Sequence, residues 1–382
     1  MADSLNENSL KNKLPKRILQ CFVSNDGDGV TESIFNNYQY MDRKVIKYDF
    51  LYIKEKPWFF KELESQGSQF IKIPSLKNPI AYFNSIRRVI CNGKYDAVYF
   101  NLSFGHIFPV LAAYMGHAAK IIVHAHASDI DRGASWKRFI IRCYHKISRN
   151  LWGRLIDYHL ACSEVAGQFL FKKDDLDKLY LVHNSIDLKK YYFNDEIRMQ
   201  VRRELGISPS TFVVGHVGRF SYQKNHDYLI HVFDEINEIN SNSILLLVGD
   251  GPEKQKVQDK VQELGLTKKV LFLGYRKDVN KLMMAMDVFI LPSRFEGLGI
   301  VLIEAQASGL QCLVSKIVPK EAIVSPLINF LDISINPRHW AECALKDAKI
   351  LNRVSPYDCI KEHGYDNRTE ALKIQDFYLG EL

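Results

Sequence analysis

Short, nearly continuous runs of apolar residues recur along the whole chain and alternate with longer amphipathic stretches. Strands that are buried on both faces of a parallel sheet have this composition, whereas half-exposed strands alternate apolar and polar residues. The intervening stretches of roughly 15–30 residues fit crossover helices. The runs lie at 18–24, 95–100, 120–126, 158–163, 179–184, 212–217, 244–249, 270–274, 288–292 and 312–315. We therefore expect an α/β protein built on parallel sheets.

A chain of 382 residues exceeds what one hydrophobic core usually serves, so we expect two domains. A polar, aromatic segment at 185–194 separates the two sets of runs and predicts one Rossmann-like domain at 1–188 and a second at 189–357. Ligands of doubly wound sheets bind outside the carboxyl ends of the strands. The chemically active residues are therefore expected directly after strands, around a cleft that two facing sheets would share.

The charge and the cysteine content narrow the class of protein further. Lys and Arg outnumber Asp and Glu by 51 to 44, a mild excess that suits an anionic small molecule or an acidic membrane and does not require a nucleic acid. The seven cysteines are scattered without a zinc-type spacing, so we expect reduced thiols, a cytoplasmic protein and no metal site. A polar N-terminus and the lack of a long apolar run predict neither a signal peptide nor a membrane span.

The strongest candidate site follows the run at 288–292, where two glycines lead from a loop into a helix. The first N–H groups of a helix have no internal partner and bind anions readily. Gly297 precedes four amides that we take as candidates for holding a diphosphate, those of Leu298, Gly299, Ile300 and Val301.

Two glutamates flank this helix start. Glu304 lies in the helix, where its carboxylate can accept hydrogen bonds from the two hydroxyls of a ribose. Glu296 lies in the preceding loop and can do the same for sugar hydroxyls. Alternatively, Glu296 only caps the helix and Glu304 is only a solvated helical acid. That alternative does not explain why glycines, which are costly inside a helix or strand, lie at this position.

A second candidate follows the run at 212–217. The strand ends near Gly218, and Arg219 and Lys224 then lie five residues apart in a loop before a helix. The guanidinium of Arg219 can bind phosphate oxygens in a bidentate manner, and Lys224 adds a point charge. Isolated cations in loops are usually only solvated, so this motif is weak by itself. The glycine-rich stretch at 249–251 is interpreted only as a turn.

In the N-terminal half, small residues around Gly29 follow the first strand, and His124 and His126 end the run at 120–126. The glycines either let a ligand approach the backbone or form an ordinary tight turn. A histidine at the carboxyl end of a strand can hydrogen-bond a sugar hydroxyl or serve as a buried structural group. We favour His126 over His124 for the functional role.

The segment 132–154 carries seven Lys or Arg residues, no acid, and apolar residues at helical spacing. Such a basic amphipathic helix can lie on an anionic membrane surface. The alternative is one core-facing stripe with a solvated basic face.

Together these motifs resemble the retaining, GT-B-fold glycosyltransferases of family 4, close to members of bacterial exopolysaccharide and capsule synthesis. The resemblance covers nearly the whole chain, including 41–51, the interdomain stretch at 184–187, and the two glutamates eight residues apart, Glu296 and Glu304. It implies two Rossmann-like domains facing a central cleft and a C-terminal helix, at about 358–382, that returns to the N-terminal domain. It also implies transfer of a sugar, with retention and usually without a metal, from a nucleotide-diphosphate donor such as a UDP-sugar to a saccharide or lipid-linked acceptor.

The resemblance assigns a role to each matching residue. Arg219 and Lys224 bind the diphosphate, Glu304 the ribose and Glu296 the donor sugar, while His126 lies near the transferred sugar and Arg276 flanks the base. The sequence departs from the family in the first loop, where the usual glycine pair reads Asp28-Gly29, and at Gly299, where proline is common. A non-catalytic partner subunit, which would not bind nucleotide diphosphates if its site had decayed, and a sugar-nucleotide epimerase, which needs no acceptor, are the alternative functions.

Overall fold

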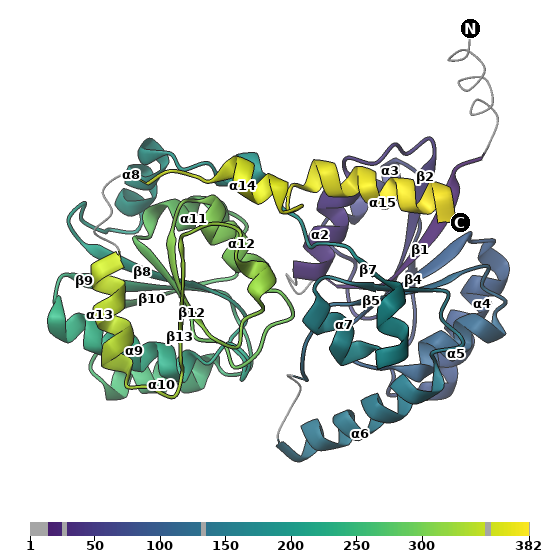
Figure 1. Ribbon diagram of the computed structural model, residues 1–382, viewed down its shortest axis with the longest axis horizontal. Coiled ribbons are helices and arrows are strands. Elements are labelled where there is room, and N and C mark those ends of the chain that lie inside the picture. Colours follow the sequence, from purple (N-terminus) through teal and green to yellow (C-terminus); the bar gives the residue numbers. More distant parts are fainter. Residues whose placement is uncertain (1–13, 25–28, 131–134, 348–352, 382) are drawn as a thin grey trace, which may run out of the picture. The chain divides into compact units, whose positions relative to one another are not determined.

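The structure is a computed structural model that describes residues 14–24, 29–130, 135–347 and 353–381 (Figure 1). It divides into two compact units, Met1–Ser185 with Asn367–Leu382, and Ile186–Asp366. The chain thus leaves the first unit after residue 185, against the expected 188, and returns at residue 367 rather than near 358. The segment before residue 367 stays with the second unit because Tyr365 is buried and its hydroxyl donates to the carbonyl oxygen of Glu321 (2.9 Å).

The first unit contains a sheet of seven strands in the order β3-β2-β1-β4-β5-β6-β7, and every pair of neighbours is parallel. The strands are β1 (Lys16–Val23), β2 (Ile46–Tyr52), β3 (Phe70–Lys72), β4 (Ala97–Leu102), β5 (Ile121–Ala125), β6 (Tyr158–Ala161) and β7 (Leu179–Leu181). The helices are α2 (Gly29–Tyr38), α3 (Phe60–Ser65), α4 (Pro79–Gly93), α5 (Ile107–Met115), α6 (Ser135–Leu151), α7 (Glu164–Leu170), the 3-10 helix η1 (Lys173–Lys178) and α15 (Asn367–Glu381).

Five of these strands coincide with the predicted apolar runs, whereas β2 and β3 were not predicted. Charged residues interrupt the apolar pattern of β2, and one of them, Asp49, is fully buried. Its carboxylate pairs with the guanidinium of Arg17 and accepts a hydrogen bond from the backbone N–H of Gln69 (2.7 Å). A buried charge that is paired and hydrogen-bonded is tolerated in a core, which sequence periodicity does not reveal.

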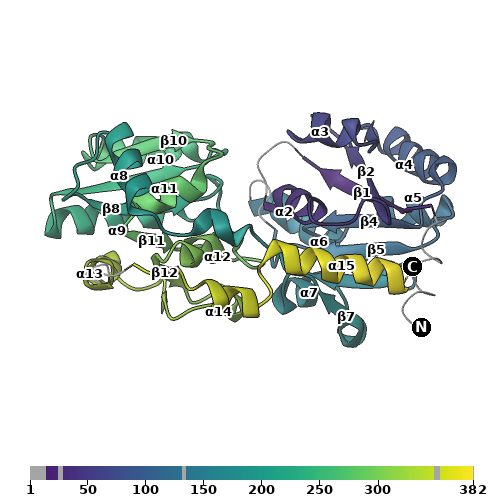
Figure 2. The same cartoon turned by 90° about the horizontal axis from the view of Figure 1, so that it is seen from above.

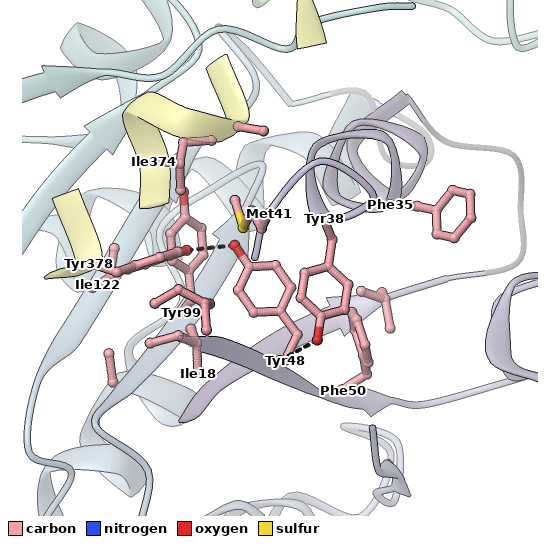
Figure 3. Packing of buried hydrophobic residues seen from close by; sticks show 14 of the residues in the cluster. Ile18, Phe35, Tyr38, Met41, Tyr48, Phe50, Tyr99, Ile122, Ile374 and Tyr378 are labelled. Atoms are coloured by element: carbon pink, nitrogen blue, oxygen red, sulfur yellow. Dashed lines mark hydrogen bonds between the residues drawn. The ribbon is translucent and has the colours of Figure 1, made fainter. Parts of the chain in front are cut away.

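Aromatic side chains dominate the core on the face of this sheet that α2 and α15 cover (Figure 3). The rings of Tyr38 and Tyr48 stack at 4.3 Å, and the hydroxyl of Tyr48 donates to that of Tyr378 in α15 (3.1 Å). Ile374 and Phe377 of the same helix are buried in this cluster. The C-terminal helix is therefore part of the core of the first unit, and Figure 2 shows it lying alongside α2.

The second unit contains a six-stranded parallel sheet in the order β10-β9-β8-β11-β12-β13. The strands are β8 (Phe212–Val217), β9 (Ser243–Val248), β10 (Val270–Gly274), β11 (Val288–Leu291), β12 (Gln311–Ser315) and β13 (Ile328–Leu331). The helices are η2 (Leu188–Tyr191), α8 (Asp195–Glu204), α9 (His226–Ile239), α10 (Lys254–Glu263), α11 (Val279–Ala285), α12 (Ile300–Ala307), η3 (Lys320–Ala322), α13 (Pro337–Asp347) and α14 (Tyr357–Glu362). Only β13, a short edge strand, was missed.

Successive side chains of these strands enter opposite cores. Val214 packs with α9, α10 and α13, whereas its neighbour Val213 packs with α8, α11 and α12. Because both faces are covered, the strands are apolar throughout, as the sequence pattern indicated. In both sheets the strand order reverses beside the first strand, between β1 and β4 and between β8 and β11. Doubly wound folds bind ligands at the carboxyl ends of these strands.

Candidate active site

The loops that follow β8 and β11 lie side by side at the point where the strand order of the second sheet reverses. The backbone N–H of Arg294 donates to the carbonyl oxygen of Gln223 (2.7 Å), and the side-chain amide of Asn225 donates to the carbonyl oxygen of Pro292 (3.1 Å). These bonds join residues about seventy positions apart in sequence. Both strongest candidate motifs are therefore part of one site.

A buried ion pair forms the centre of this site. The ammonium of Lys224 lies 2.6 Å from Oε1 of Glu296, and the side chains are 14% and 5% exposed. Ser293 Oγ donates to the same oxygen (2.7 Å), and Gln223 Nε2 donates to Oε2 (3.0 Å). The sequence predicted both charged residues but not Ser293 and Gln223, whose only signal was adjacency to the motif. Three donors hold the carboxylate in one orientation before any ligand binds.

Glycines bring the backbone close to this pair. A Cβ on Gly218 would lie 3.2 Å from Cε of Lys224, so the lysine side chain passes directly over this glycine. Gly249 has a φ of +134°, and a Cβ there would lie 2.1 Å from the carbonyl oxygen of Gly218. The stretch at 249–251, which was predicted to be only a turn, thus supports the loop that carries the cations.

The start of α12 adjoins the ion pair. Gly299 has a φ of +80°, and a Cβ on it would lie 3.7 Å from Cγ of Glu296. The backbone N–H of Leu302 donates to the carbonyl oxygen of Gly299 (2.8 Å), so the amides of Ile300 and Val301 precede the hydrogen-bonded turns of the helix. Helix N-termini of this kind attract anions. The Lys224–Glu296 pair therefore adjoins Gly299, the residue from which α12 begins.

A tyrosine that sequence reasoning missed holds the second glutamate. The hydroxyl of Tyr191, in η2, donates to Oε1 of Glu304 (2.7 Å). This contact orients the carboxylate that was predicted to bind ribose. Tyr191 lies more than one hundred residues before its partner, in a segment without a recognisable motif.

The two remaining cations differ from each other. Arg219 is exposed, and within the described part of the chain no hydrogen bond or ion pair engages its guanidinium. Arg276, which was predicted to flank the base, donates to both oxygens of Asp278 (2.7 and 2.6 Å). Its loop follows β10, and Gly274 in that strand accepts a hydrogen bond from the N–H of Gly249. Arg276 thus lies two loops away from Lys224, on the β9 side of the site.

Two buried imidazoles lie beneath the cationic loop. His216 donates from Nδ1 to the carbonyl oxygen of Ile290 (2.8 Å), and its ring lies 4.7 Å from that of His226. Burial, together with a smaller effect of the charge of Lys224, lowers the pKa of His216 to about 4 and that of His226 to about 2. Both rings are consequently neutral near pH 7, and the cationic charge here comes from Lys224 and Arg219.

In the first unit, His126 follows β5 and its Nε2 lies 3.1 Å from Oδ1 of Asn101, just before the end of β4. The ring of His124 lies 3.9 Å away and is bonded to the hydroxyl of Tyr99 (2.8 Å). Gly29 is an exposed residue at the start of α2, and Asp28 and the other residues of the preceding loop lie outside the described residues. Both histidines border a small cavity of about 30 Å³.

The described residues contain no cluster of three or more His, Cys, Asp or Glu that is arranged to hold a metal ion. None of the described helices has the length and apolar character needed to cross a bilayer. All seven cysteines are free thiols.

Two doubly wound parallel sheets in one chain define the GT-B class of fold. Comparison with solved structures supports this assignment. The structure of HepE from Anabaena in complex with UDP and glucose superposes with a TM-score of 0.76 at 19% identity, over 95% of this chain and 99% of that one. WaaG, a glycosyltransferase of lipopolysaccharide biosynthesis, gives 0.68 at 16% identity, over 95% and 100%.

Sequence comparison identifies the family. Residues 198–342 match the family model described as glycosyl transferases group 1. The putative glycosyltransferase EpsF of Bacillus subtilis is 30% identical over 96% of this chain and 97% of its own length. An Escherichia coli UDP-Gal:alpha-D-GlcNAc-diphosphoundecaprenol alpha-1,3-galactosyltransferase is 29% identical over 77% and 78%. The chain belongs to the group 1 glycosyltransferases and is a glycosyltransferase.

Proposed function

We propose that this glycosyltransferase moves a sugar from a UDP-sugar to a saccharide or lipid-linked acceptor, with retention of anomeric configuration. The observation that carries the proposal is the Lys224–Glu296 pair at the start of α12. A diphosphate placed there would meet an ammonium and helix amides on one side and a carboxylate suited to sugar hydroxyls on the other. The UDP complex of HepE and the UDP-Gal-dependent activity named for the E. coli relative support this donor class.

The proposed mechanism is electrostatic. As the bond between the sugar and the diphosphate breaks, negative charge grows on the leaving phosphate. Lys224, Arg219 and the amides at 298–301 stabilise this charge more strongly in the transition state than in the ground state. We propose that these groups suffice without a metal ion, that Glu304 binds the ribose, and that Arg276 flanks the base. His126 of the first unit is proposed to contact the transferred sugar.

The donor class is tested by thermal shift and calorimetry with UDP, GDP, UDP-glucose, UDP-galactose and UDP-N-acetylglucosamine. We expect UDP and one UDP-sugar to stabilise the protein, and Lys224→Met to weaken UDP binding at least tenfold. An unchanged affinity in a folded Lys224→Met protein would contradict the site. If the protein binds UDP-sugars but transfers no sugar to added acceptors, under conditions in which related glycosyltransferases are active, a role as partner subunit is favoured. If it isomerises the sugar without an acceptor, an epimerase is favoured.

We further propose that α6 places the enzyme on an anionic membrane, on its cytoplasmic face. The buried face of this helix is polar: Nδ1 of His145 accepts from the N–H of Gly105 (2.7 Å), and Oγ of Ser148 accepts from the N–H of Ile107 (3.3 Å). The opposite face is apolar and exposed. It comprises Trp136 (61%), Phe139 (68%), Ile140 (56%), Ile147 (57%) and Leu151 (62%). The alternative of a core-facing apolar stripe is wrong for these five side chains.

The charges on α6 favour an anionic surface as the partner of this apolar face. The exposed cations Lys137 and Lys146 flank the apolar stripe, and the helix contains no acidic residue, whereas the guanidinium of Arg142 is paired with Asp129 (2.7 Å). Arg132, also part of the predicted basic segment, lies outside the described residues. Apolar residues that enter the headgroup region together with flanking cations are typical of helices that lie on anionic bilayers. A lipid-linked acceptor would be available at such a surface.

Vesicle co-sedimentation tests the membrane proposal. We expect binding to phosphatidylglycerol vesicles and much weaker binding to phosphatidylcholine vesicles. The double variant Phe139→Glu/Ile147→Glu should lose at least tenfold in partitioning, since each buried apolar side chain contributes roughly 1.5–3 kcal/mol. Leu372→Glu, on an exposed site of α15, is the matched control. Equal sedimentation of the double variant and the control would contradict the proposal. A dimer that light scattering detects for the parent protein but not for the double variant would contradict it as well.

A further inference from the structure

The two ring nitrogens of His126 have different surroundings. Nε2 lies 3.1 Å from Oδ1 of Asn101. Nδ1 is also buried, yet among the described residues nothing hydrogen-bonds to it. A neutral imidazole carries one donor and one acceptor nitrogen, and the partner of one nitrogen decides the role of the other.

The orientation of the Asn101 amide follows from its neighbours. Its Nδ2 lies 3.3 Å from the carbonyl oxygen of Cys21 and 3.1 Å from Oε1 of Gln20. A backbone carbonyl can only accept, so the NH₂ group of Asn101 must face Cys21 and its oxygen must face His126. The imidazole therefore donates from Nε2.

We propose that Asn101 is a positioning residue that holds His126 in the Nε2–H tautomer, so that Nδ1 accepts a hydrogen bond from a hydroxyl of the sugar substrate. This inference rests on the proposed glycosyl transfer and adds to it the atom that meets the sugar and the residue that prepares it. Burial lowers the pKa of His126, which keeps the ring neutral and its Nδ1 lone pair available near pH 7.

The hydrogen-bond chain continues from Asn101 to the C-terminal helix. Gln20 accepts from Asn101 with Oε1, and its Nε2 donates to the hydroxyl of Tyr378 (3.4 Å). Tyr378 in turn accepts from Tyr48, the contact drawn in Figure 3. Residues from β1, β2, β4 and α15 thus fix the amide that fixes His126. A buried network in which each member is satisfied holds its groups rigidly.

Several titratable groups border the cavity that His126 lines, and the carboxylate of Glu370 lies close by, where it accepts a hydrogen bond from the backbone N–H of His183 (2.9 Å). The groups that line this cavity with His126 are His124, His183, Tyr48, Tyr99 and Tyr378. Burial lowers the pKa of His124 and raises the pKa values of the three tyrosines, so these four groups are neutral at pH 7.

Asn101→Asp tests the inference. A carboxylate against Nε2 favours the imidazolium, which protonates Nδ1 and removes its acceptor. We expect UDP release from the UDP-sugar that binds best to fall about tenfold per pH unit below a new apparent pKa in the neutral range, and to recover at high pH. The parent enzyme should show no such acid limb. Asn37→Asp is the matched control, because Asn37 lines the same cavity and bonds to Ser185 instead of His126 (2.6 Å).

A second measurement does not depend on activity. In ¹⁵N-histidine NMR spectra of the parent protein, Nδ1 of His126 should be unprotonated, and Asn101→Leu should mix the two tautomers. A protonated Nδ1 in the parent protein would overturn the inference. It would also be overturned if the pH profile of Asn101→Asp matched that of the parent or that of Asn37→Asp. UDP titration of the same variants separates this result from a failure of the proposed function, because UDP binding is assigned to the second unit alone.

Discussion

Removing the charge of Lys224 should damage both the activity and the stability of this enzyme, for separable reasons. Lys224→Met retains most of the side-chain volume but leaves Glu296 without its cation, while the neutral donors Ser293 and Gln223 stay in place. The carboxylate is 5% exposed, so water cannot replace the ammonium. Breaking a buried ion pair from one side typically costs about 3–5 kcal/mol. We expect a loss near the lower end of this range, since the hydrogen bonds from Ser293 and Gln223 persist.

The catalytic loss has a similar magnitude but a different origin. A preorganised donor aimed at the developing charge contributes about 3 kcal/mol, or roughly a hundredfold in turnover. The double variant Lys224→Met/Glu296→Gln removes the buried negative charge without restoring the cation. It should therefore recover most of the free energy of unfolding, to within about 1 kcal/mol of the parent, while turnover stays low.

Denaturant unfolding followed by circular dichroism measures the first effect, and UDP release from a UDP-sugar measures the second. Glu296→Gln alone should destabilise less than Lys224→Met, because the 14% exposed ammonium reaches water more easily than the carboxylate does. A double variant as unstable as Lys224→Met would refute the buried-charge argument. Turnover of a folded Lys224→Met protein within tenfold of the parent would refute the electrostatic role.

Three further predictions follow from contacts around the same site. Tyr191→Phe should weaken UDP binding about five- to tenfold in calorimetry, with little loss of stability, because it removes one hydrogen bond to the Glu304 carboxylate that we assign to the ribose. An unchanged affinity would mean that Glu304 is not part of the donor site. Gly249→Ala should impair UDP binding and stability more than Gly265→Ala. Both glycines have a positive φ, but only a Cβ on Gly249 would meet backbone, 2.1 Å from the carbonyl oxygen of Gly218. Equal losses in the two variants would contradict the close packing of these loops. His216 and His226 have folded-state pKa values of about 4 and about 2, below the ordinary 6.5, so the unfolded chain binds more protons in this interval. The stability that their neutral forms contribute is thus complete above pH 6.5 and is lost as pH falls toward 4, with a slope of at most about 1.4 kcal/mol per pH unit for each ring; substituting both by Phe should flatten this slope in denaturant unfolding measured at pH 4 to 7.

The class of fold and the main motifs of the candidate site could be predicted from local sequence. Strands covered on both faces must be apolar throughout. All but three of the thirteen strands in the described residues could therefore be recognised as apolar runs. Gly218 marks a position where another part of the chain passes close to the backbone, and Gly299 marks the start of a helix. Both features depend on local backbone conformation, which glycine in a sequence indicates. Lys224, Glu296 and Glu304 lie beside these marks, so local pattern was enough to select them.

What the sequence could not determine were the partners that come from distant segments. Asp49 interrupts the pattern of β2 because Arg17, on the neighbouring strand, neutralises it. Tyr191 holds Glu304, and Asn101 faces His126, through parallel pairing and packing that bring separate loops together. The burial of apolar residues can be predicted from their local periodicity. A hydrogen bond between side chains of remote segments depends instead on how the fold places those segments relative to each other. Only the tertiary structure could therefore decide which polar residues orient the site.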